Sequence, residues 1–284
     1  MRRISVGLAL AAVAAIVVAG IGPADSRAAP SRLEREIYSP AVEGRLGLAV
    51  YLPADYATSK ARFPVVYFLH GLPATPTSYQ ASAFIARAVE QVGGEAIVVA
   101  PQGARANDTD PEYLDWGRGR NWSTAISRDV VHYVDSHFRT IRNRDGRALI
   151  GLSAGGYGAM IIAVNNLATY GAVESWSGYF HPTDPSGTHA LDLGSAEANA
   201  NASAHTYVKR LERDQARRPT LIGFYVGRSD RRFLSENIEF DRELRAGGVR
   251  HVFDIYPGGH QQSLWTSHAA AWLALALRHL APPT

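Results

Sequence analysis

Residues 147–159 read Arg-Ala-Leu-Ile-Gly-Leu-Ser-Ala-Gly-Gly-Tyr-Gly-Ala, and the rest of the chain is organised around this stretch. A short apolar run ends at Gly151, and a helical pattern opens after Ser153, the centre of a G-x-S-x-G motif. On a sharp turn from a buried strand into a helix, such a serine projects its hydroxyl at the sheet edge, where the helix N-terminus favours negative charge. The motif predicts a nucleophile; a glycine-rich helix start whose serine only caps is the alternative.

Buried strands alternate with amphipathic helices on both sides of this motif. After an Ala/Pro/Ser linker, apolar runs bounded by Gly and Pro predict strands at 45–52, 64–69, 95–100, 172–177, 221–226 and 249–256. Helical spacing of apolar residues predicts helices near 84–92, 126–138, 233–244 and 265–280. This alternation indicates one α/β domain, residues 29–284, with a mostly parallel sheet covered on both faces. Ligands of such sheets bind beyond the carboxyl ends of the strands.

The strand and helix pattern fails in one long segment, residues 181–218. It is rich in Ala, Asn, Asp and Ser, with a helix expected near 202–214. We interpret the segment as an insertion over one face of the sheet and as a candidate lid or specificity element. A solvated surface excursion is the alternative.

Three polar residues follow the predicted ends of separate strands: Ser153, Asp230 and His260. Serine needs an imidazole to accept its proton and a carboxylate to hold that imidazole in the right tautomer. The chain order serine, acid, histidine is that of α/β-hydrolases, so these three are the candidate catalytic residues. Glu236 and Asp254 compete for the role of the acid. Asp230 is preferred because it lies on the loop after its strand.

A tetrahedral intermediate also needs two N–H donors for its oxyanion. The amide of Ala154, directly after the nucleophile, is the first candidate, and the amide of Leu72, after the strand that ends at His70-Gly71, is the second. We interpret His70 as a structural residue of its loop. It precedes Ser153 in the chain, whereas the base of this order follows the serine and the acid. Trp122 and Trp265 are candidates to line a substrate pocket.

The first residues have the layout of a secretory signal. Arg2 and Arg3 precede an apolar run, residues 4–21, and small residues lead to a cleavage site after Ala28. We therefore expect residues 1–28 to be a signal peptide and the protein to be secreted or associated with the cell envelope. An uncleaved membrane anchor is the alternative, since the apolar run is just long enough to span a bilayer.

Composition narrows the range of partners. Removing residues 1–28 takes away three arginines and one aspartate, which leaves 26 cationic and 25 anionic side chains and a net charge of +1. This balance argues against nucleic acid. The chain has no cysteine, and its ten histidines include no motif of metal-ligand spacing. We therefore expect no cofactor and no metal, an ester of a small molecule, glycan or lipid as substrate, and membrane contact only if the N-terminal segment is retained.

Several motifs together resemble the esterase D family of α/β-hydrolases. They are the run from Val65 to Leu72, residues 133–140, the motif around Ser153, and Tyr256-Pro-Gly-Gly-His260 followed by Trp265. The family includes secreted carboxylesterases, feruloyl and acetyl xylan esterases, S-formylglutathione hydrolase and the antigen 85 mycolyltransferases. The resemblance implies the α/β-hydrolase fold and ester chemistry through an acyl-enzyme. It also implies the triad Ser153, Asp230 and His260, with Leu72 and Ala154 as oxyanion donors.

Three functions are compatible with these residues. The leading hypothesis is a secreted serine carboxylesterase in which water releases the acyl group. The second is an acyltransferase of mycolyltransferase type, in which a sugar or lipid alcohol replaces that water. The third is a non-catalytic binding protein on a hydrolase scaffold, since a fold does not fix a function.

Overall fold

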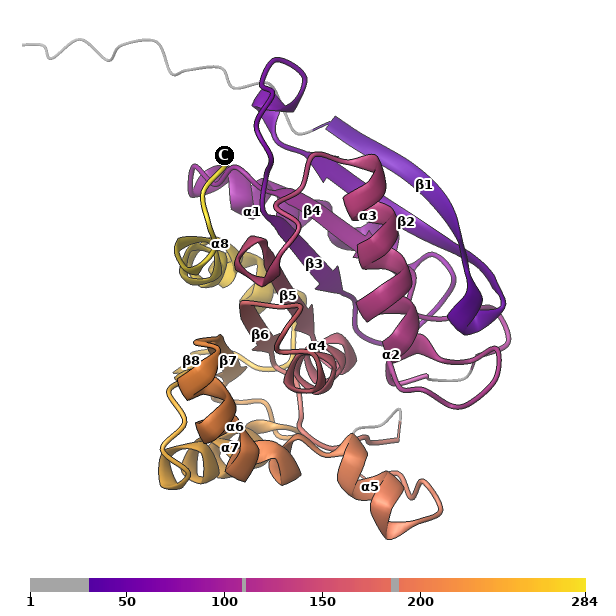
Figure 1. The fold of residues 1–284 in the computed structure, drawn as a ribbon. Coiled ribbons are helices and arrows are strands. Elements are labelled where there is room, and N and C mark those ends of the chain that lie inside the picture. Colours follow the sequence, from indigo (N-terminus) through magenta and orange to yellow (C-terminus); the bar gives the residue numbers. More distant parts are fainter. Residues whose placement is uncertain (1–30, 109–110, 185–188) are drawn as a thin grey trace, which may run out of the picture.

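The computed structural model describes residues 31–108, 111–184 and 189–284 and contains one eight-stranded sheet (Figure 1). The strands are β1 (Ser31–Ser39), β2 (Gly44–Leu52), β3 (Val65–Leu69), β4 (Ile97–Pro101), β5 (Arg147–Leu152), β6 (Ala172–Trp176), β7 (Leu221–Gly227) and β8 (Val252–Tyr256). Their order is β1-β2-β4-β3-β5-β6-β7-β8. The β1–β2 and β2–β4 pairs are antiparallel, and the five other pairs are parallel. The prediction of a mostly parallel sheet is confirmed. The predicted signal peptide, residues 1–28, lies outside the described residues.

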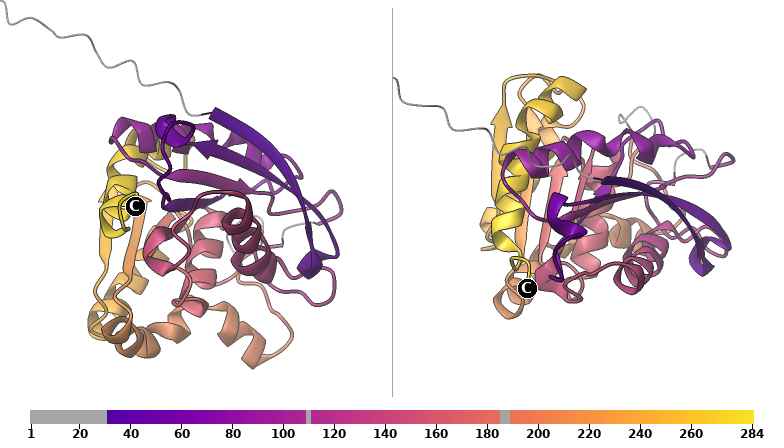
Figure 2. Two further views of the ribbon diagram at one scale, coloured as in Figure 1. Left: turned by 45° about the horizontal axis from the view of Figure 1, so that its top comes forward. Right: turned by 90° about the horizontal axis from the view of Figure 1, so that it is seen from above.

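Helices cover both faces of the sheet (Figure 2). They are α1 (Ala83–Gln91), α2 (Trp122–Thr124), α3 (Val131–His137), α4 (Ala154–Asn165), α5 (Ala196–Ala202), α6 (Val208–Arg217), α7 (Leu234–Ala246) and α8 (Gln262–His279), with a π-helical turn, Ala125–Val130, joining α2 to α3. In the part of the chain that the structure describes, no helix combines the length and apolar content needed to cross a bilayer.

The alternation of side chains along β3 explains the two apolar layers. Val65, Tyr67 and Leu69 point into the layer formed with α3, α4, α6 and α7. Val66 and Phe68 point into the opposite layer, formed with α1 and α8. Because both faces are buried, the central strands have continuous apolar sequences, as is typical of parallel sheets.

The structure adds a strand that the sequence pattern did not predict. Residues 31–39 form β1, which pairs along its whole length with β2, from Ser31 opposite Leu52 to Ser39 opposite Gly44. Only Ile37 and Ser39 of β1 are buried. An edge strand with charged, exposed side chains shows no apolar alternation, and such charges protect an open edge from pairing with other chains.

The connection between β6 and β7 also differs from its prediction. Its last part, α6, buries Val208 and Leu211 against the same core as α4. Parallel neighbouring strands require such a crossover helix. Residues 208–217 are therefore part of the α/β framework rather than of an insertion, and the excursion is confined to residues 181–207.

Candidate active site

The turn between β5 and α4 holds Ser153 in a backbone conformation that residues other than glycine rarely adopt, with φ 54° and ψ −124°. The neighbouring positions Gly151 and Gly155 have no space for a side chain, which explains why both are glycine. A Cβ on Gly151 would collide with the Gly155 carbonyl, and a Cβ on Gly155 would collide with the Leu69 carbonyl. Backbone strain of this kind persists only where the surroundings enforce it, and here it presents the Ser153 hydroxyl beyond the end of β5.

The structure brings the three candidate catalytic residues together. His260 Nε2 lies 2.9 Å from Ser153 Oγ, and His260 Nδ1 lies 2.8 Å from Asp230 Oδ2. An ionised carboxylate only accepts hydrogen bonds, so Nδ1 carries the proton and Nε2 can accept the serine proton. The spacing is that of a nucleophile, its base and the group that orients the base.

Asp230 is fixed by its position at the start of α7. Its side chain is buried, and Oδ1 accepts the backbone N–H groups of Arg232 and Phe233 at 3.2 and 3.3 Å. Phe233 also contacts His260 edge-on, with ring centroids 5.2 Å apart. The acid and the base are therefore both held by the first residues after β7.

The two competing acids lie elsewhere. Asp254 is exposed within β8. Glu236 is paired with His181 and His205. Burial opposes its ionisation, but hydrogen bonds from these two histidines lower its pKa to about 2.

The two candidate oxyanion donors flank the serine. Ala154 is the first residue of α4, so its N–H has no acceptor within the helix. Leu72 lines the same pocket as Ser153 and His260. An oxyanion formed on an ester bound at Ser153 would also meet the positive end of the α4 dipole.

His70 supports the loop beside the site. It is buried, and its Nδ1 lies 2.9 Å from the Gly71 carbonyl oxygen while its Nε2 accepts the Gly103 N–H at 3.2 Å. Burial lowers the pKa of His70, which favours the neutral ring. The Tyr113 hydroxyl donates to the His70 carbonyl oxygen at 2.8 Å. These bonds agree with a role in loop architecture.

An apolar pocket of about 240 Å³ opens at Ser153. Apolar side chains from β3, the loop after β3, β5, α1 and α8 line it, and they include Phe68, Leu72, Phe84, Leu152 and Trp265. Trp265 is oriented by a hydrogen bond from its Nε1 to Ser177 Oγ, 3.0 Å long, and its ring meets His260 edge-on. Phe68 and Phe84 were not predicted as site residues. The apolar pattern of β3 and α1 indicates only that they are buried.

Trp122 requires a correction. It is fully buried at the start of α2, in the core layer on the same face of the sheet as α3 and α4, and does not line the pocket at Ser153. Trp122 lies in a long polar and irregular segment, residues 103–123, and such a segment favours a position at the functional rim. In the structure its apolar ring fills the core instead, so it is not placed to contact a substrate.

The described part of the segment predicted as a lid lies outside the pocket wall. Among the described residues of segment 181–218, none lines the pocket at Ser153. These residues pack beside α4 and α7; the Tyr157 hydroxyl, for example, donates to the Ala202 carbonyl oxygen at 2.7 Å. A role as a lid stays a prediction.

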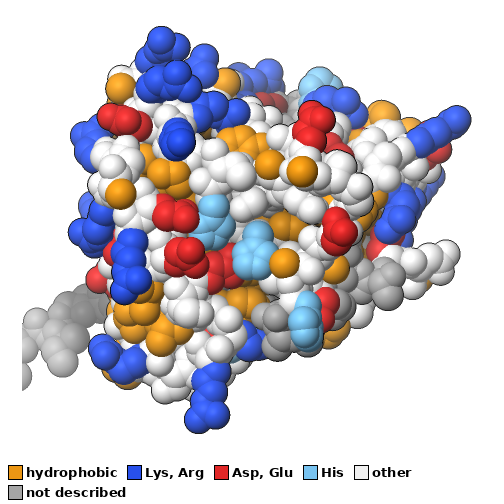
Figure 3. Space-filling model, turned by 90° about the horizontal axis from the view of Figure 1, so that it is seen from below, with side chains coloured by type: hydrophobic (Ala, Val, Ile, Leu, Met, Phe, Trp, Pro, Cys, Tyr) orange, Lys and Arg blue, Asp and Glu red, His pale blue; other side chains and the backbone are white. Residues whose placement is uncertain are grey.

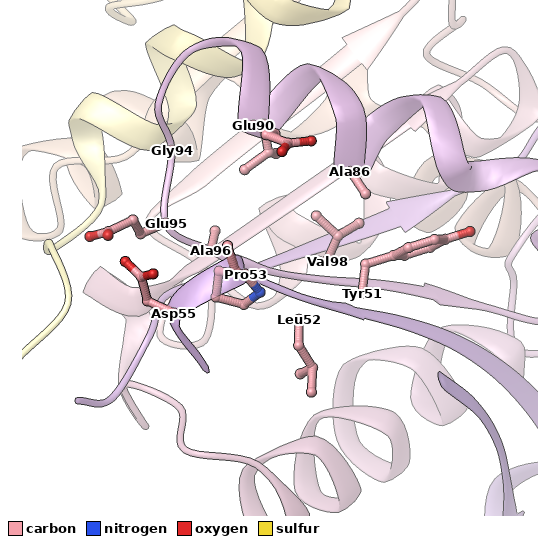
Figure 4. A pocket seen from close by; sticks show the side chains of 12 residues that line it. Tyr51, Leu52, Pro53, Asp55, Ala86, Glu90, Gly94, Glu95, Ala96 and Val98 are labelled. Atoms are coloured by element: carbon pink, nitrogen blue, oxygen red, sulfur yellow. The ribbon is translucent and has the colours of Figure 1, made fainter. Parts of the chain in front are cut away.

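A second, smaller hollow lies at the opposite end of the sheet, between β2, α1 and the start of β4 (Figure 4). Asp55, Glu90 and Glu95 border it beside apolar side chains. It is at the amino end of β4, whereas the triad residues follow the carboxyl ends of their strands. This hollow therefore has no part in the arrangement around Ser153.

A parallel sheet with a strained serine between β5 and α4, and an acid and a histidine after later strands, defines the α/β-hydrolase class. The chain belongs to the esterase family: the family described as "Putative esterase" matches residues 39–274. The resemblance expected from the motifs is confirmed.

A curated relative is also an esterase, and solved structures share the fold. Esterase Rv1288 of Mycobacterium tuberculosis is 27% identical over 239 residues, which cover 75% of this chain and 52% of that protein. The chain thus spans about half the length of this relative. A ferulic acid esterase is 23% identical with a TM-score of 0.73, covering 88% of this chain and 98% of that one. FphF, a fluorophosphonate-binding serine hydrolase of Staphylococcus aureus, is 19% identical with a TM-score of 0.74, covering 88% and 99%. Both structures share the fold.

Proposed function

We propose that this protein is an exported serine carboxylesterase that hydrolyses esters with small acyl groups. The observation that carries the proposal is the hydrogen-bonded series Ser153 Oγ, His260 Nε2, His260 Nδ1 and Asp230 Oδ2 on a strained turn beside an apolar pocket. Membership of the esterase family supports the same activity.

The proposed reaction has two halves. Ser153 Oγ attacks the ester carbonyl carbon while its proton passes to His260 Nε2, and the Leu72 and Ala154 amides donate to the oxyanion. The intermediate collapses as His260 returns the proton to the departing alkoxide, which leaves as an alcohol. Water then attacks the acyl-enzyme, giving its proton to His260, and the second collapse releases the acid and restores the Ser153 hydroxyl.

The size of the pocket supports small acyl groups. A volume of about 240 Å³ lies below the range of about 300–1,000 Å³ common for ligand pockets. Water, rather than a bulky alcohol, is the acyl acceptor in this proposal. Export rests on the sequence of residues 1–28, with cleavage after Ala28.

The test is turnover of p-nitrophenyl esters from acetate to dodecanoate, with and without added trehalose or glycerol. We expect acetate or butyrate to give the highest kcat/KM, with the free acid as the product. A long-chain optimum with acyl transfer to the added alcohol would support the acyltransferase. Absence of turnover on every ester would favour a binding protein.

Pocket size is tested by Phe84→Ala. The ring of Phe84 lies 5.6 Å from that of Phe68, measured between centroids, and its removal lengthens the pocket. We expect the optimum acyl chain to become longer, with each additional buried CH₂ contributing about 0.8 kcal/mol. Trp116→Ala is the matched control, because Trp116 is an aromatic residue outside this pocket. An unchanged optimum in Phe84→Ala would place the acyl group elsewhere.

A further inference from the structure

A cluster of histidine and glutamate side chains lies outside the candidate active site, between the β6–β7 connection and α7. His181 follows β6, His205 precedes α6, and Glu236 lies in the first turn of α7. One ligand atom from each of the three lies within 4.8 Å of the others. On the face of the molecule formed by α5, α6 and α7, histidine and acidic side chains gather near the centre (Figure 3).

His205 is held as metal-binding histidines are. Its Nδ1 lies 2.6 Å from Glu243 Oε2, and its Nε2 lies 3.5 Å from Glu236 Oε1. Because the carboxylate of Glu243 accepts hydrogen bonds only, the neutral ring keeps its proton on Nδ1, and Nε2, which otherwise donates to Glu236, then presents a lone pair. A carboxylate behind a ligating histidine is the usual second partner that fixes tautomer and ring orientation at a metal.

Glu236 and His181 complete a set of donors on one side of a hollow. Glu236 Oε1 lies 2.6 Å from His181 Nδ1 and is fixed by the backbone N–H of Phe180 at 2.6 Å. The side chain of Glu236 is only 12% exposed, so its charge is partly removed from water. A partly buried carboxylate beside two imidazoles supplies the oxygen and nitrogen donors that a transition-metal ion accepts.

A second observation points to a ligand at the same place. Thr183 lines this hollow, is 3% exposed, and has a buried Oγ1 without a hydrogen-bond partner among the described residues. Buried hydroxyl groups normally have a partner, and leaving one unpaired costs free energy. A water molecule bound to a metal would supply the missing hydrogen bond.

We propose that His181, His205 and Glu236 bind one divalent transition-metal ion of the zinc class. Two imidazoles and one carboxylate are ligands that Zn²⁺ accepts in tetrahedral sites, and water takes the fourth position. The ion would join the connection that leaves β6 to the first turn of α7. Asp230 lies on the loop that opens that same helix, so the site would stabilise the framework next to the triad. The sequence indicates no metal, because these ligands are far apart in the chain and form no motif.

The test is equilibrium dialysis of the untagged, chelator-treated mature protein against buffered Zn²⁺, with metal analysis and thermal unfolding. We expect one bound equivalent, and a rise in Tm of about 5–10 °C at roughly a hundredfold excess of Zn²⁺ over its Kd. His181→Asn and His205→Asn are each expected to weaken binding at least about tenfold, and Glu243→Gln by about tenfold through its effect on His205.

His132→Asn is the control, since His132 is an exposed histidine on α3. Its Zn²⁺ affinity should equal that of the unmodified protein. Circular dichroism verifies the fold of each variant. Glu236 is not replaced, because it also accepts backbone N–H groups and its loss would disturb the local fold. The two histidine variants therefore decide the outcome. No bound equivalent, or the same affinity in both histidine variants as in the unmodified protein, would overturn the proposal.

Discussion

At the scale of single residues, Asp230 combines two tasks that an amide cannot combine. One carboxylate oxygen accepts two backbone N–H groups at the start of α7, and the other accepts the Nδ1 proton of His260. Both oxygens must therefore be acceptors. With both oxygens accepting hydrogen bonds, the carboxylate can be buried without leaving a polar atom unpaired.

Asp230→Asn tests this role. The amide can present its N–H₂ to His260 Nδ1, which favours the tautomer that carries its proton on Nε2 and cannot accept the serine proton. We expect kcat to fall by about ten-thousandfold while KM and the fold are retained. Steady-state kinetics and circular dichroism measure this, with Asp254→Asn, an exposed carboxylate on β8, as the control. Wild-type kcat in Asp230→Asn would remove Asp230 from the triad.

Glu174 is a second buried acid, and its protonation affects the stability of the fold rather than the reaction at Ser153. It lies on β6, fully buried beside α8, and accepts a hydrogen bond from Trp176 Nε1 at 3.0 Å. Burial raises the pKa of Glu174 to about 8. The folded protein therefore keeps the proton at neutral pH, whereas the unfolded chain releases it near pH 4.5.

This difference predicts a loss of stability as pH rises. The contribution of Glu174 is fully present below about pH 4.5 and is lost as pH rises through about 8, at about 1.4 kcal/mol per pH unit. Glu174→Gln removes the titration and can still accept from Trp176. Urea unfolding at pH 5.5 and 7.5 should show a smaller decrease in the free energy of unfolding for the variant. Equal decreases in both proteins would show that Glu174 does not titrate in this way.

At the scale of elements, the junction of β5 and α4 is what makes Ser153 available. Gly155 allows α4 to approach the end of β3, where the Leu69 carbonyl occupies the space that a side chain would need. The tight contact lets the helix begin directly beneath the serine. The position of the nucleophile thus depends on the closeness of two neighbouring elements.

Gly155→Ala is expected to move these elements apart. The added methyl group meets backbone atoms that cannot rotate away, so we expect a loss of about 1–3 kcal/mol in the free energy of unfolding and a marked fall in kcat. Gly44→Ala is the matched control, because the nearest atom to its Cβ is the Val42 carbonyl oxygen at an ordinary 3.5 Å. Denaturant unfolding and ester turnover measure both effects. A Gly155→Ala protein as stable and active as Gly44→Ala would contradict this account of the turn.

Predictability from sequence also differs among the elements. The buried strands and the helices around Ser153 were predictable because parallel strands are continuous apolar runs between turn residues. The edge strand β1 was not, since its outward charged side chains hide the pattern. The predicted excursion, residues 181–218, extends too far along the chain, because the amphipathic α6 follows directly on irregular residues.

At the scale of the whole molecule, what could be predicted depended on the chain order and not on distances. The order Ser153, Asp230, His260 after the ends of three separate strands was enough to propose the three residues that the structure brings together. The pocket wall and the cluster of His181, His205 and Glu236 depend on contacts between remote segments. No spacing of residues along the sequence indicates these contacts. For the same reason the sequence did not show that Trp122 lies in the core rather than in the substrate pocket.

The sequence of the N-terminus makes a prediction about the exported molecule. Small residues at Ser26 and Ala28, after the apolar run, predict cleavage between Ala28 and Ala29. Intact-mass analysis of protein from the culture medium of a secreting host should therefore give a chain that begins at Ala29. Ala28→Tyr should accumulate uncut precursor. Recovery of the unmodified chain only in membranes, with Met1 still present, would favour a retained anchor.

The central claim, nucleophilic catalysis by Ser153, is tested most directly by intact-mass analysis after brief mixing with p-nitrophenyl acetate or a fluorophosphonate. We predict one acetyl or phosphonyl adduct per chain, mapped to Ser153 by peptide sequencing, and no adduct in Ser153→Ala, which should remain folded but inactive. An adduct on another residue, or turnover in Ser153→Ala equal to that of the unmodified protein, would contradict the account.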